Sequence, residues 1–507
     1  MDLATSFRDA VEREPDAPAL VDGTLRLTYA QWLARIASVA TGLRALGVGE
    51  GDRVLAVLRN GEPLCTLYWA CALLGAAITP VNWRLADGEL AYIVGDAEPR
   101  CAVVEDVGPQ IARVAHAVPT VGVGTVVGAA TSWAALVRTP PATLPPVAET
   151  ATAILLYTSG TTGRPKGVPR THRAERAAAL AHVAQNRYRR GEVTLGSMPL
   201  YHTMGVRSLV AMALTNGTFV SMPKFDAAGA LDLIECERIT NLYLAPTLYY
   251  DLVHVPGIEA RDLRSLTKLG YAGAPMTPSL VERCFALFAP EIFVNHYGST
   301  EIYTFTIYDQ LDRKPACAGK AGLNECVRVV RLGSDDPDDV CVPGESGQII
   351  ARLDSEEAFA GYWRRPDADA KAIRSGWYFN GDLGMKDDDG DLFVLGRVDD
   401  MIITGGENVY PAEVEDVIAA HPAVGRCAII GVRDERLGEK IVAFVEPLAA
   451  VSAAELDAYA RGSGMTQFKR PREYVFVAAI PQSASGKVLR TELRAGNYTT
   501  LPQEIPS

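Results

Sequence analysis

The stretch from Tyr157 to Gly167, "YTSGTTGRPKG", combines glycines, hydroxyl side chains and a lysine in a way that suits a polyphosphate. Glycines let backbone N–H groups point at a ligand, hydroxyls add donors, and Lys166 adds a positive charge. The stretch is not a Walker A loop, because Pro165 separates Lys166 from the preceding residues where that motif has Gly-Lys. A flexible surface turn is the alternative, but ordinary turns seldom need so many hydroxyls. The pattern therefore favours a phosphate-binding loop.

Regular elements must hold such a loop in place. The apolar run "AILL" (153–156) predicts a buried strand that leads into it. Thr28 and Gln31 form a capping box, which predicts a helix that ends at Gly47. "DRVLAVL" (52–58) and "GAAITPV" (75–81) predict strands. Helices and short apolar strands alternate to about residue 310, which is typical of a layered α/β fold.

Two further regions follow along the chain. From about residue 320 to 397, strands such as "GQIIARL" and "DLFVLG" alternate with turns, which predicts a small β-barrel-like unit. Next, Pro411 suits the first turn of a helix, strands "CAIIGV" and "IVAFVEP" follow, and a second helix begins near Ala453. This pattern predicts a small α+β domain. We expect an N-terminal domain of residues 1–398 and a mobile C-terminal domain of residues 399–507.

Composition narrows the function classes. The formal net charge of −12 argues against nucleic-acid binding as the main function, although a local basic site remains open. Nine cysteines without a CxxC pair argue against a disulfide framework and structural zinc, and they fit a reducing, cytoplasmic setting. The most apolar stretch, Leu67 to Val81, is too short to span a bilayer. It predicts a core helix that runs into a strand, and we expect no membrane role.

Five segments in order resemble the motifs of the adenylate-forming superfamily, which includes acyl- and aryl-CoA ligases, luciferases and the adenylation domains of peptide synthetases. They are "YTSGTTGRPKG", "NHYGSTE" (295–301), "WYFNGDLG" (377–384), "GRVDDMIITGGENVYPAEVE" (396–415) and "PQSASGKVLR" (481–490). The resemblance implies ATP, Mg²⁺ and coenzyme A as cofactors and a small carboxylic acid as substrate. A carboxylate oxygen would attack the α-phosphorus of ATP, and the thiol of coenzyme A would then attack the acyl-adenylate. Many relatives are dimers, so a homodimer is one expectation.

The resemblance also implies roles for individual residues. Lys487 would bridge carboxylate and phosphate oxygens, while Glu301 and Thr162 would bind Mg²⁺; with His202, these are the catalytic candidates. Tyr297 would lie beside adenine, and Asp382 and Arg397 beside the ribose. The full set expected at ATP or AMP is Thr158, Ser159, Gly160, Thr161, Thr162, Gly163, Lys166, Tyr297, Gly298, Ser299, Thr300, Asp382 and Arg397.

Thiol attack needs different surroundings, and the family provides them by rotating the C-terminal domain, with Asp399 as the implied hinge. Gly405, Gly406 and Glu407 would then line the tunnel for the pantetheine arm. Lys469, Arg470 and Arg472, in "FKRPREY", would hold the phosphates of coenzyme A, and an ordinary solvated face is the alternative. Leu437 replaces an aromatic residue of the 4-chlorobenzoate type, so the detailed coenzyme A contacts are expected to differ.

Within the superfamily, "MPLYH" (198–202), "GRVDDMI", "GGEN" and "FKRP" resemble the 4-chlorobenzoate-type aryl-CoA ligases. His202 would be a gate or positioning group, with a satisfied core histidine as the alternative. His296 stands where that group has an apolar residue, and Arg207 interrupts an apolar run. Arg207 would face a polar or anionic substituent of the substrate, or pair with an internal acid. The acyl-pocket candidates are His202, Thr203, Met204, Tyr271, Ala272, Gly273, His296, Gly298, Tyr303 and Thr304.

These small, aromatic and polar types favour a benzoate-like or heteroaromatic acid, with a small aliphatic or dicarboxylic acid as the second expectation. A stand-alone adenylation enzyme that loads a carrier protein is a rival, but "YHTMG" and "YAGAPMT" offer no aspartate for an amino group. A luciferase-like oxygenase resembles the chain less. A non-catalytic nucleotide sensor would not need Lys487, Glu301 and Asp382, and all three are present.

Overall fold

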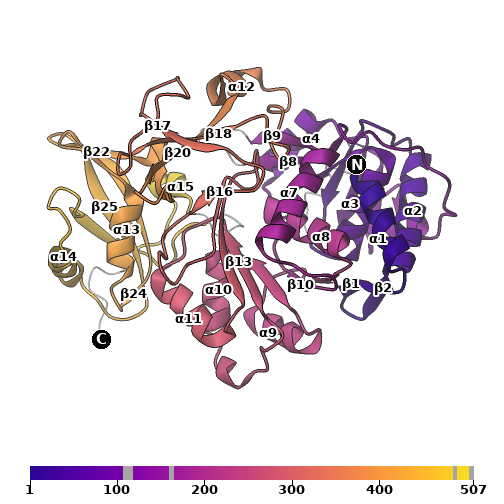
Figure 1. The fold of residues 1–507 in the computed structure, drawn as a ribbon, viewed down its shortest axis with the longest axis horizontal. Helices are drawn as coiled ribbons and strands as arrows, with labels where there is room; N and C mark the ends of the chain where they lie inside the picture. Colours follow the sequence, from indigo (N-terminus) through magenta and orange to yellow (C-terminus); the bar gives the residue numbers. More distant parts are fainter. Residues whose placement is uncertain (107–117, 159–164, 483–487, 502–507) are drawn as a thin grey trace. The chain divides into compact units, whose positions relative to one another are not determined.

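The computed structural model describes residues 1–106, 118–158, 165–482 and 488–501 (Figure 1). The chain forms two compact units: Met1–Cys326 with Arg352–Gly376, and Val327–Ala351 with Trp377–Ser507. Layered α/β elements fill the first unit, and the end of the chain is a small α+β domain, so both predictions of fold class are confirmed. The expected boundary between residues 398 and 399 falls inside the second unit, which also contains the preceding β-rich strands. That boundary stays a prediction.

A seven-stranded sheet in the first unit carries the phosphate-loop hairpin. Its order is β7 (Thr131–Ser132), β6 (Thr120–Val123), β5 (Cys101–Glu105), β3 (Arg53–Val57), β4 (Ala77–Pro80), β8 (Thr152–Thr158) and β9 (Lys166–Thr171). All neighbouring pairs are parallel except β8 and β9. Alternate residues of β3 face opposite cores, because Val54 packs with α2 (Tyr29–Ala45) and α3 (Glu62–Leu74), and Leu55 with α4 (Asp87–Ala97).

The first unit also contains a nine-stranded sheet, whose order is β16 (Lys320–Ala321), β15 (Thr306–Tyr308), β14 (Ile292–Tyr297), β13 (Lys268–Ala272), β12 (Asn241–Leu244), β10 (Val193–Gly196), β11 (Thr218–Ser221), β1 (Pro18–Asp22) and β2 (Leu25–Thr28). The strands from β14 to β1 run parallel. Its helices are α1 (Leu3–Arg13), α7 (His172–Gln185), α8 (Thr203–Thr215), α9 (Ala227–Cys236), α10 (Pro246–Val253) and α11 (Pro278–Phe288). Phe7 of α1 contacts the rings of Tyr29, Trp32 and Trp69, which joins α1, α2 and α3 in one core. The unit also includes the short elements α6 (Trp133–Val137), η1 (Ile258–Ala260), α12 (Pro366–Ala372) and β19 (Ile373–Arg374).

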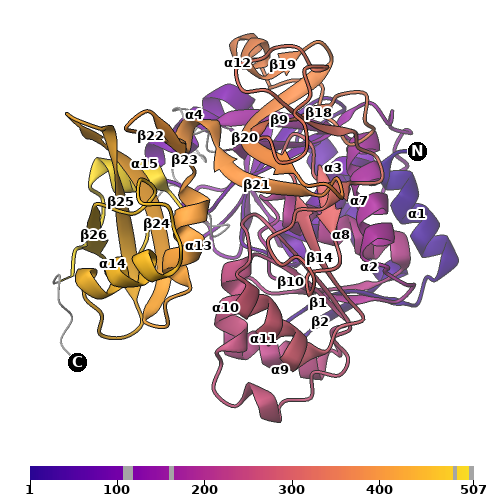
Figure 2. The ribbon, with the colours of Figure 1, turned by 60° about the vertical axis from the view of Figure 1, so that its left-hand side comes forward.

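The second unit has two sheets. One contains β17 (Val327–Val330), β18 (Gly347–Arg352), β20 (Trp377–Lys386) and β21 (Leu392–Arg397). The other contains β23 (Glu407–Val409), β22 (Ile402–Thr404), β25 (Gly438–Pro447), β24 (Val424–Asp434) and β26 (Glu473–Phe476). Ile429 packs with α13 (Pro411–Ala419) and α14 (Ala453–Gly462), while its neighbour Ile430 packs with α15 (Arg490–Ala495), so helices cover both faces of this sheet (Figure 2).

Several local predictions are confirmed by these elements. The capping box of Thr28 and Gln31 is present, although its helix ends at Ala45, two residues before the expected glycine. The apolar stretch from Leu67 is the end of α3 followed by β4, and Pro411 is the first residue of α13. None of the helices in the described ranges is both long and apolar enough to cross a membrane.

Candidate active site

The β8–β9 hairpin joins the two ends of the phosphate-loop candidate. Thr158, the last residue of β8, lies opposite Lys166, the first of β9, and its Oγ1 donates a long hydrogen bond of 3.5 Å to the Lys166 carbonyl. The sheet therefore fixes the loop's ends at adjacent positions. The other loop candidates, Ser159, Gly160, Thr161, Thr162 and Gly163, lie outside the described residues.

Tyr362 links two charged ATP candidates that are far apart in the sequence. Its hydroxyl donates a 2.6 Å hydrogen bond to Oε1 of Glu301. The Lys166 Nζ lies 4.1 Å from the centre of the Tyr362 ring, a cation–π contact. Tyr362 is 5% exposed. Sequence reasoning missed this residue, and the only signal was an aromatic pair in "AGYWRRP".

Glu301 is buried and held from several sides. Its backbone N–H donates to Ser299 Oγ over 3.2 Å, and its carbonyl accepts from Arg170 Nη1 over 3.0 Å. Arg170 is itself fully buried, paired with Glu175 at 2.6 Å and stacked 3.8 Å over the Tyr303 ring. Among the described residues, Tyr362 hydrogen-bonds the Glu301 carboxylate, and its hydroxyl contacts only the Oε1 oxygen. The second oxygen therefore fits the expected role as a ligand for a hard cation such as Mg²⁺.

A tight turn after β14 joins the adenine candidates, residues 297–300, to the acyl candidates Tyr303 and Thr304. The Tyr297 carbonyl accepts from the Phe305 N–H over 2.8 Å, and their rings lie 5.3 Å apart. A Cβ atom at Gly298 would lie 2.2 Å from the Tyr303 carbonyl oxygen. Only glycine fits there, because the turn brings the two backbone segments into contact.

Most of the acyl-pocket candidates are enclosed in protein. His202 is half-buried, and Gly273 and Gly298 are exposed. The buried members are Thr203, Met204, Tyr271, Ala272, His296, Tyr303 and Thr304. Among the described residues, the Tyr271 hydroxyl and His296 Nδ1 are buried without a hydrogen-bond partner. The candidates thus form a largely enclosed set that contains unsatisfied polar atoms.

His202 precedes α8 and stays neutral near pH 7. Its backbone carbonyl accepts from the N–H groups of Gly205 and Val206, so the helix fixes its position. Burial, followed by the positive charge of Arg207, lowers the pKa of His202 to about 4. Its Nδ1 is buried and has no partner in the described part of the chain. A satisfied core histidine, the alternative weighed above, does not describe this side chain.

Arg207 lies inside the first unit and contacts the acyl candidates. It donates hydrogen bonds to Thr304 Oγ1 and to the Tyr243 hydroxyl. Within the described ranges it forms no ion pair with a carboxylate. Glu357 is the internal acid that interacts electrostatically with Arg207, without an ion pair, so both alternatives for Arg207 stay predictions. His296, the other unexpected polar residue, shares hydrogen bonds of 3.1 and 3.2 Å with the Asn186 amide.

The ribose candidates in the second unit lie together. Asp382 of β20 is opposite Arg397 of β21, and Arg397 Nη1 donates to Asp382 Oδ1 over 2.7 Å. Asn380 Nδ2 donates to the other carboxylate oxygen over 2.9 Å. Asn380, which sequence reasoning did not single out, thus orients the acid. This β-pair brings together two residues that the sequence separates by 15 positions.

The coenzyme A candidates divide into two groups. Gly405 and Gly406 form the turn between β22 and β23 with φ of +62° and +86°, values that favour glycine, and Glu407 follows. The basic group already has partners, because Lys469 Nζ lies 2.5 Å from Glu413 and Arg470 Nε 2.8 Å from Asp457. Arg472 donates to the carbonyl of Gln467. Phosphate binding by Lys469 or Arg470 would therefore compete with these carboxylates.

The hinge candidate Asp399 lies in a short 3₁₀ helix, η2 (Val398–Asp400). The next residue, Asp400, is tied to α15 by Arg494 at 3.1 Å and Arg490 at 3.7 Å, and Arg490 also pairs with Glu415 at 2.5 Å. Lys487, the lysine expected at the reacting oxygens, lies outside the described residues, three positions before α15 begins.

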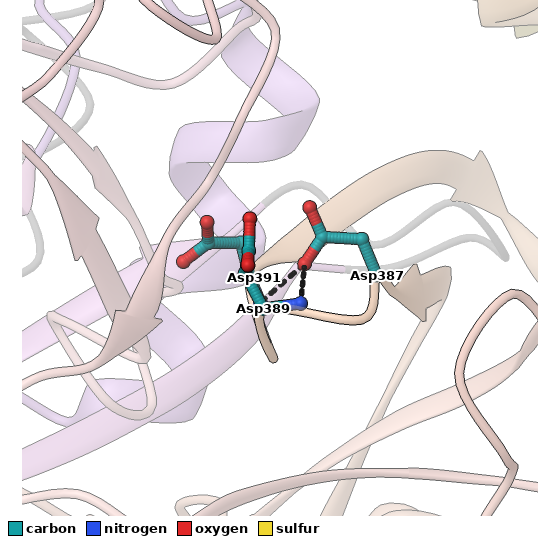
Figure 3. Close-up of side chains that lie close together, drawn as sticks. All are labelled: Asp387, Asp389 and Asp391. Carbon is teal, nitrogen blue, oxygen red and sulfur yellow. Dashed lines mark hydrogen bonds between the residues drawn. The ribbon is translucent and has the colours of Figure 1, made fainter.

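An acidic cluster in the β20–β21 turn resembles a metal site but has another explanation. The ligand atoms of Asp387, Asp389 and Asp391 all lie within 4.8 Å of one another (Figure 3). Asp387 Oδ1 accepts from the backbone N–H groups of Asp389 and Asp391 over 3.1 and 2.9 Å. This carboxylate therefore stabilises the turn "DDDGD".

The comparisons with known proteins agree with this arrangement. Residues 7–363 match the family of AMP-binding enzymes, and residues 413–487 match the AMP-binding enzyme C-terminal domain. Since the first match covers more than half of the chain, the protein belongs to this adenylate-forming superfamily.

Particular relatives narrow the class further. A long-chain-fatty-acid–CoA ligase of Mycobacterium tuberculosis is 34% identical over 94% of this chain and 95% of its own. The 4-chlorobenzoate–CoA ligase of Pseudomonas sp. (strain CBS-3) is 35% identical, covering 96% and 93%. The crystal structure of ATP-bound MatB from Rhodopseudomonas palustris has a TM-score of 0.87 and 30% identity, covering 98% of this chain and 99% of that one. The chain is an AMP-forming acid–CoA ligase, while the relatives' acids differ widely.

Proposed function

We propose that this ligase converts a compact aromatic acid, benzoate-like or heteroaromatic, into its coenzyme A thioester. The observation that carries the choice is the set of enclosed aromatic rings at the acyl candidates. Tyr271 contacts Phe293 with ring centres 5.6 Å apart, and His296 contacts Tyr243 at 5.2 Å. Flat, buried rings with polar edges suit an aromatic acid better than a long flexible chain. The likeness to a 4-chlorobenzoate–CoA ligase supports the same choice.

In the first half-reaction, a carboxylate oxygen attacks the α-phosphorus of ATP and pyrophosphate leaves. Both reactants are negative, so the protein must supply positive charge and alignment. We assign the phosphates to Lys166 and the loop, and the reacting oxygens to Lys487. Glu301, with Thr162, would bind Mg²⁺, which when bound neutralises charge on the phosphates. Tyr362 holds the Glu301 carboxylate in one orientation.

His202 acts in this scheme as a positioning group. Because its pKa is lowered to about 4, the ring is uncharged near pH 7 and does not compete with Lys487 for the carboxylate. Carboxylate attack requires no proton removal, so no general base is needed. The half-buried ring instead limits where the acid can lie.

In the second half-reaction, the thiol attacks the carbonyl carbon of the acyl-adenylate, the thioester forms and AMP leaves. We assign the pantetheine arm to the turn of Gly405 and Gly406 with Glu407, and the phosphates to the basic group. Within the basic group, Arg472 donates to a backbone carbonyl, whereas Lys469 and Arg470 pair with carboxylates. A phosphate would not have to displace a carboxylate from Arg472, which supports Arg472 as the first phosphate contact. Rotation about Asp399 would bring this domain into place.

The test is ATP–pyrophosphate exchange across aryl, heteroaryl and short aliphatic carboxylates, followed by thioester formation with coenzyme A. One aromatic acid should drive both reactions. Exchange without acylation of coenzyme A would move the acceptor to a carrier protein. Exchange driven only by aliphatic acids would overturn the aromatic assignment.

A further inference from the structure

Arg207 is a buried cation whose hydrogen-bond partners are all neutral. The residue is 2% exposed on α8. Besides Thr304 Oγ1 and the Tyr243 hydroxyl, its guanidinium approaches the Tyr303 carbonyl at 3.5 Å. The guanidinium carbon also lies 5.0 Å from the Tyr243 ring and 5.7 Å from the Tyr303 ring. Neutral partners stabilise a buried charge only in part.

The titratable groups around Arg207 include two buried histidines and one buried acid, and none of them forms an ion pair with it within the described ranges. Burial and the charge of Arg207 lower the pKa values of His182 and His296 well below the ordinary histidine range, so both rings are neutral. Glu357 is an acid that interacts electrostatically with Arg207, but the two form no ion pair. The Glu357 carboxylate accepts from Asn324 at 2.9 Å, and burial raises its pKa.

Unsatisfied polar atoms gather in the same place. Within the described ranges, Arg207 Nε and His296 Nδ1 are both buried without a hydrogen-bond partner. Such atoms are uncommon in folded proteins, because each loses its hydrogen bonds to water. His296, Tyr303 and Thr304 are also acyl candidates. The unpaired charge and the unsatisfied atoms therefore belong to the region where the acid is expected.

We propose that Arg207 selects the substrate by binding a second carboxylate, at the end of the acid remote from the reacting group. An arginine fork matches a carboxylate with two parallel hydrogen bonds, and the ion pair compensates the buried charge. This inference rests on the proposed ligase function and sharpens it to a benzoate-like dicarboxylate. A short aliphatic dicarboxylate shares the recognised group and is the second arm of the test.

The experiment measures kcat and KM for pyrophosphate release with matched pairs of acids: benzoate against its three ring-carboxylated forms, and butyrate against succinate. In the wild type, one dicarboxylate should exceed its monocarboxylate partner about 100-fold in kcat/KM. In R207M, the preference for that dicarboxylate over its monocarboxylate partner should fall about 100-fold, with the change mainly in the KM for the dicarboxylate. An unchanged ranking in R207M would overturn the inference.

Two controls make the result specific. T215A removes another buried polar group of α8, whose hydroxyl bonds only to carbonyls of the same helix, and should leave the ranking unchanged. R207K keeps the charge but loses the fork, and should retain part of the preference. Thermal unfolding gives a second readout that needs no turnover. At 10 mM, roughly 100 times a Kd of about 0.1 mM, the preferred dicarboxylate should raise the Tm of the wild type and not that of R207M. If no acid is activated, the ligase proposal fails; if no dicarboxylate shifts the Tm, the Arg207 inference fails.

Discussion

At the scale of single residues, Tyr362 connects two of the charged ATP candidates. Its hydroxyl orients Glu301 and its ring face lies against Lys166, so two groups of opposite charge depend on one side chain. The two contacts can be separated, because phenylalanine keeps the ring and loses only the hydroxyl.

We expect Y362F to lower the rate of pyrophosphate exchange about 10-fold, since a hydrogen bond to a charged group contributes about 1.5–3 kcal/mol. The loss of exchange rate in Y362F should become smaller as the Mg²⁺ concentration is raised. The Glu301 carboxylate of the variant can still bind Mg²⁺, but it is no longer held in one orientation, so it needs more metal. The KM for ATP should change little, since Lys166 keeps its ring contact. The measurement is a Mg²⁺ titration of exchange, with Y250F as control because Tyr250 contacts His254 through its ring. An equal defect at all Mg²⁺ concentrations would contradict this role.

Between elements, His172 connects the start of α7 to α1. The His172 Nδ1 accepts from the Leu3 N–H over 3.4 Å, and the ring is fully buried. Burial lowers the pKa of His172 to about 4, so protonation of this ring in the folded state is unfavourable. The contact between the two helices is therefore sensitive to acid.

We expect acid to weaken this junction in the wild type more than in H172N. An unfolded histidine has a pKa of about 6.5, so between that pH and about pH 4 the unfolded chain binds a proton that the folded chain does not. The contribution of His172 to stability is thus present above pH 6.5 and falls by about 1.4 kcal/mol per pH unit below it. The Tm difference between wild type and H172N should narrow from pH 7.5 to pH 5. H254N, which changes an exposed histidine, is the comparison variant.

The elements were more predictable than the contacts between them. Capping boxes, proline at helix starts and short apolar strands are local signals, so Thr28 and Pro411 located their helices correctly. The link between Tyr362 and Glu301 spans 61 residues, and no local pattern encodes it. The partners of Arg207 were equally unpredictable from the sequence. The local sequence around an arginine in an apolar run is the same whether a carboxylate or a tyrosine packs beside it in the fold. The roles assigned by motif remain predictions.

At the scale of the whole molecule, the proposed scheme has the C-terminal domain take one position for each half-reaction. The ion pairs of Asp400 with Arg494 and Arg490 attach the end of η2 to α15. If the chain turns at Asp399, Asp400 moves with the C-terminal domain, and α15 follows as one body. Lys487 lies outside the described residues, three positions before that helix in the sequence, and we propose that the attachment matters for the step assigned to Lys487.

D400N should therefore slow adenylation about fivefold, corresponding to about 1 kcal/mol for a partly exposed ion pair. Thioester formation from a supplied acyl-adenylate should change less, because that step does not use Lys487. Single-turnover measurements of each half-reaction distinguish the two. D388N makes the same charge change at an exposed position and should be neutral. Equal slowing of both steps would contradict the assignment.

The glycine turn after β14 has a consequence for how such an enzyme can change its acid. Since Gly298 packs directly against the Tyr303 backbone, a side chain at position 298 would displace the segment that carries the acyl candidates Tyr303 and Thr304. Helix α8 offers Arg207 from a separate element. Libraries that aim to change the acid are therefore better placed on α8 than at Gly298, where the backbone contact leaves no room for a side chain.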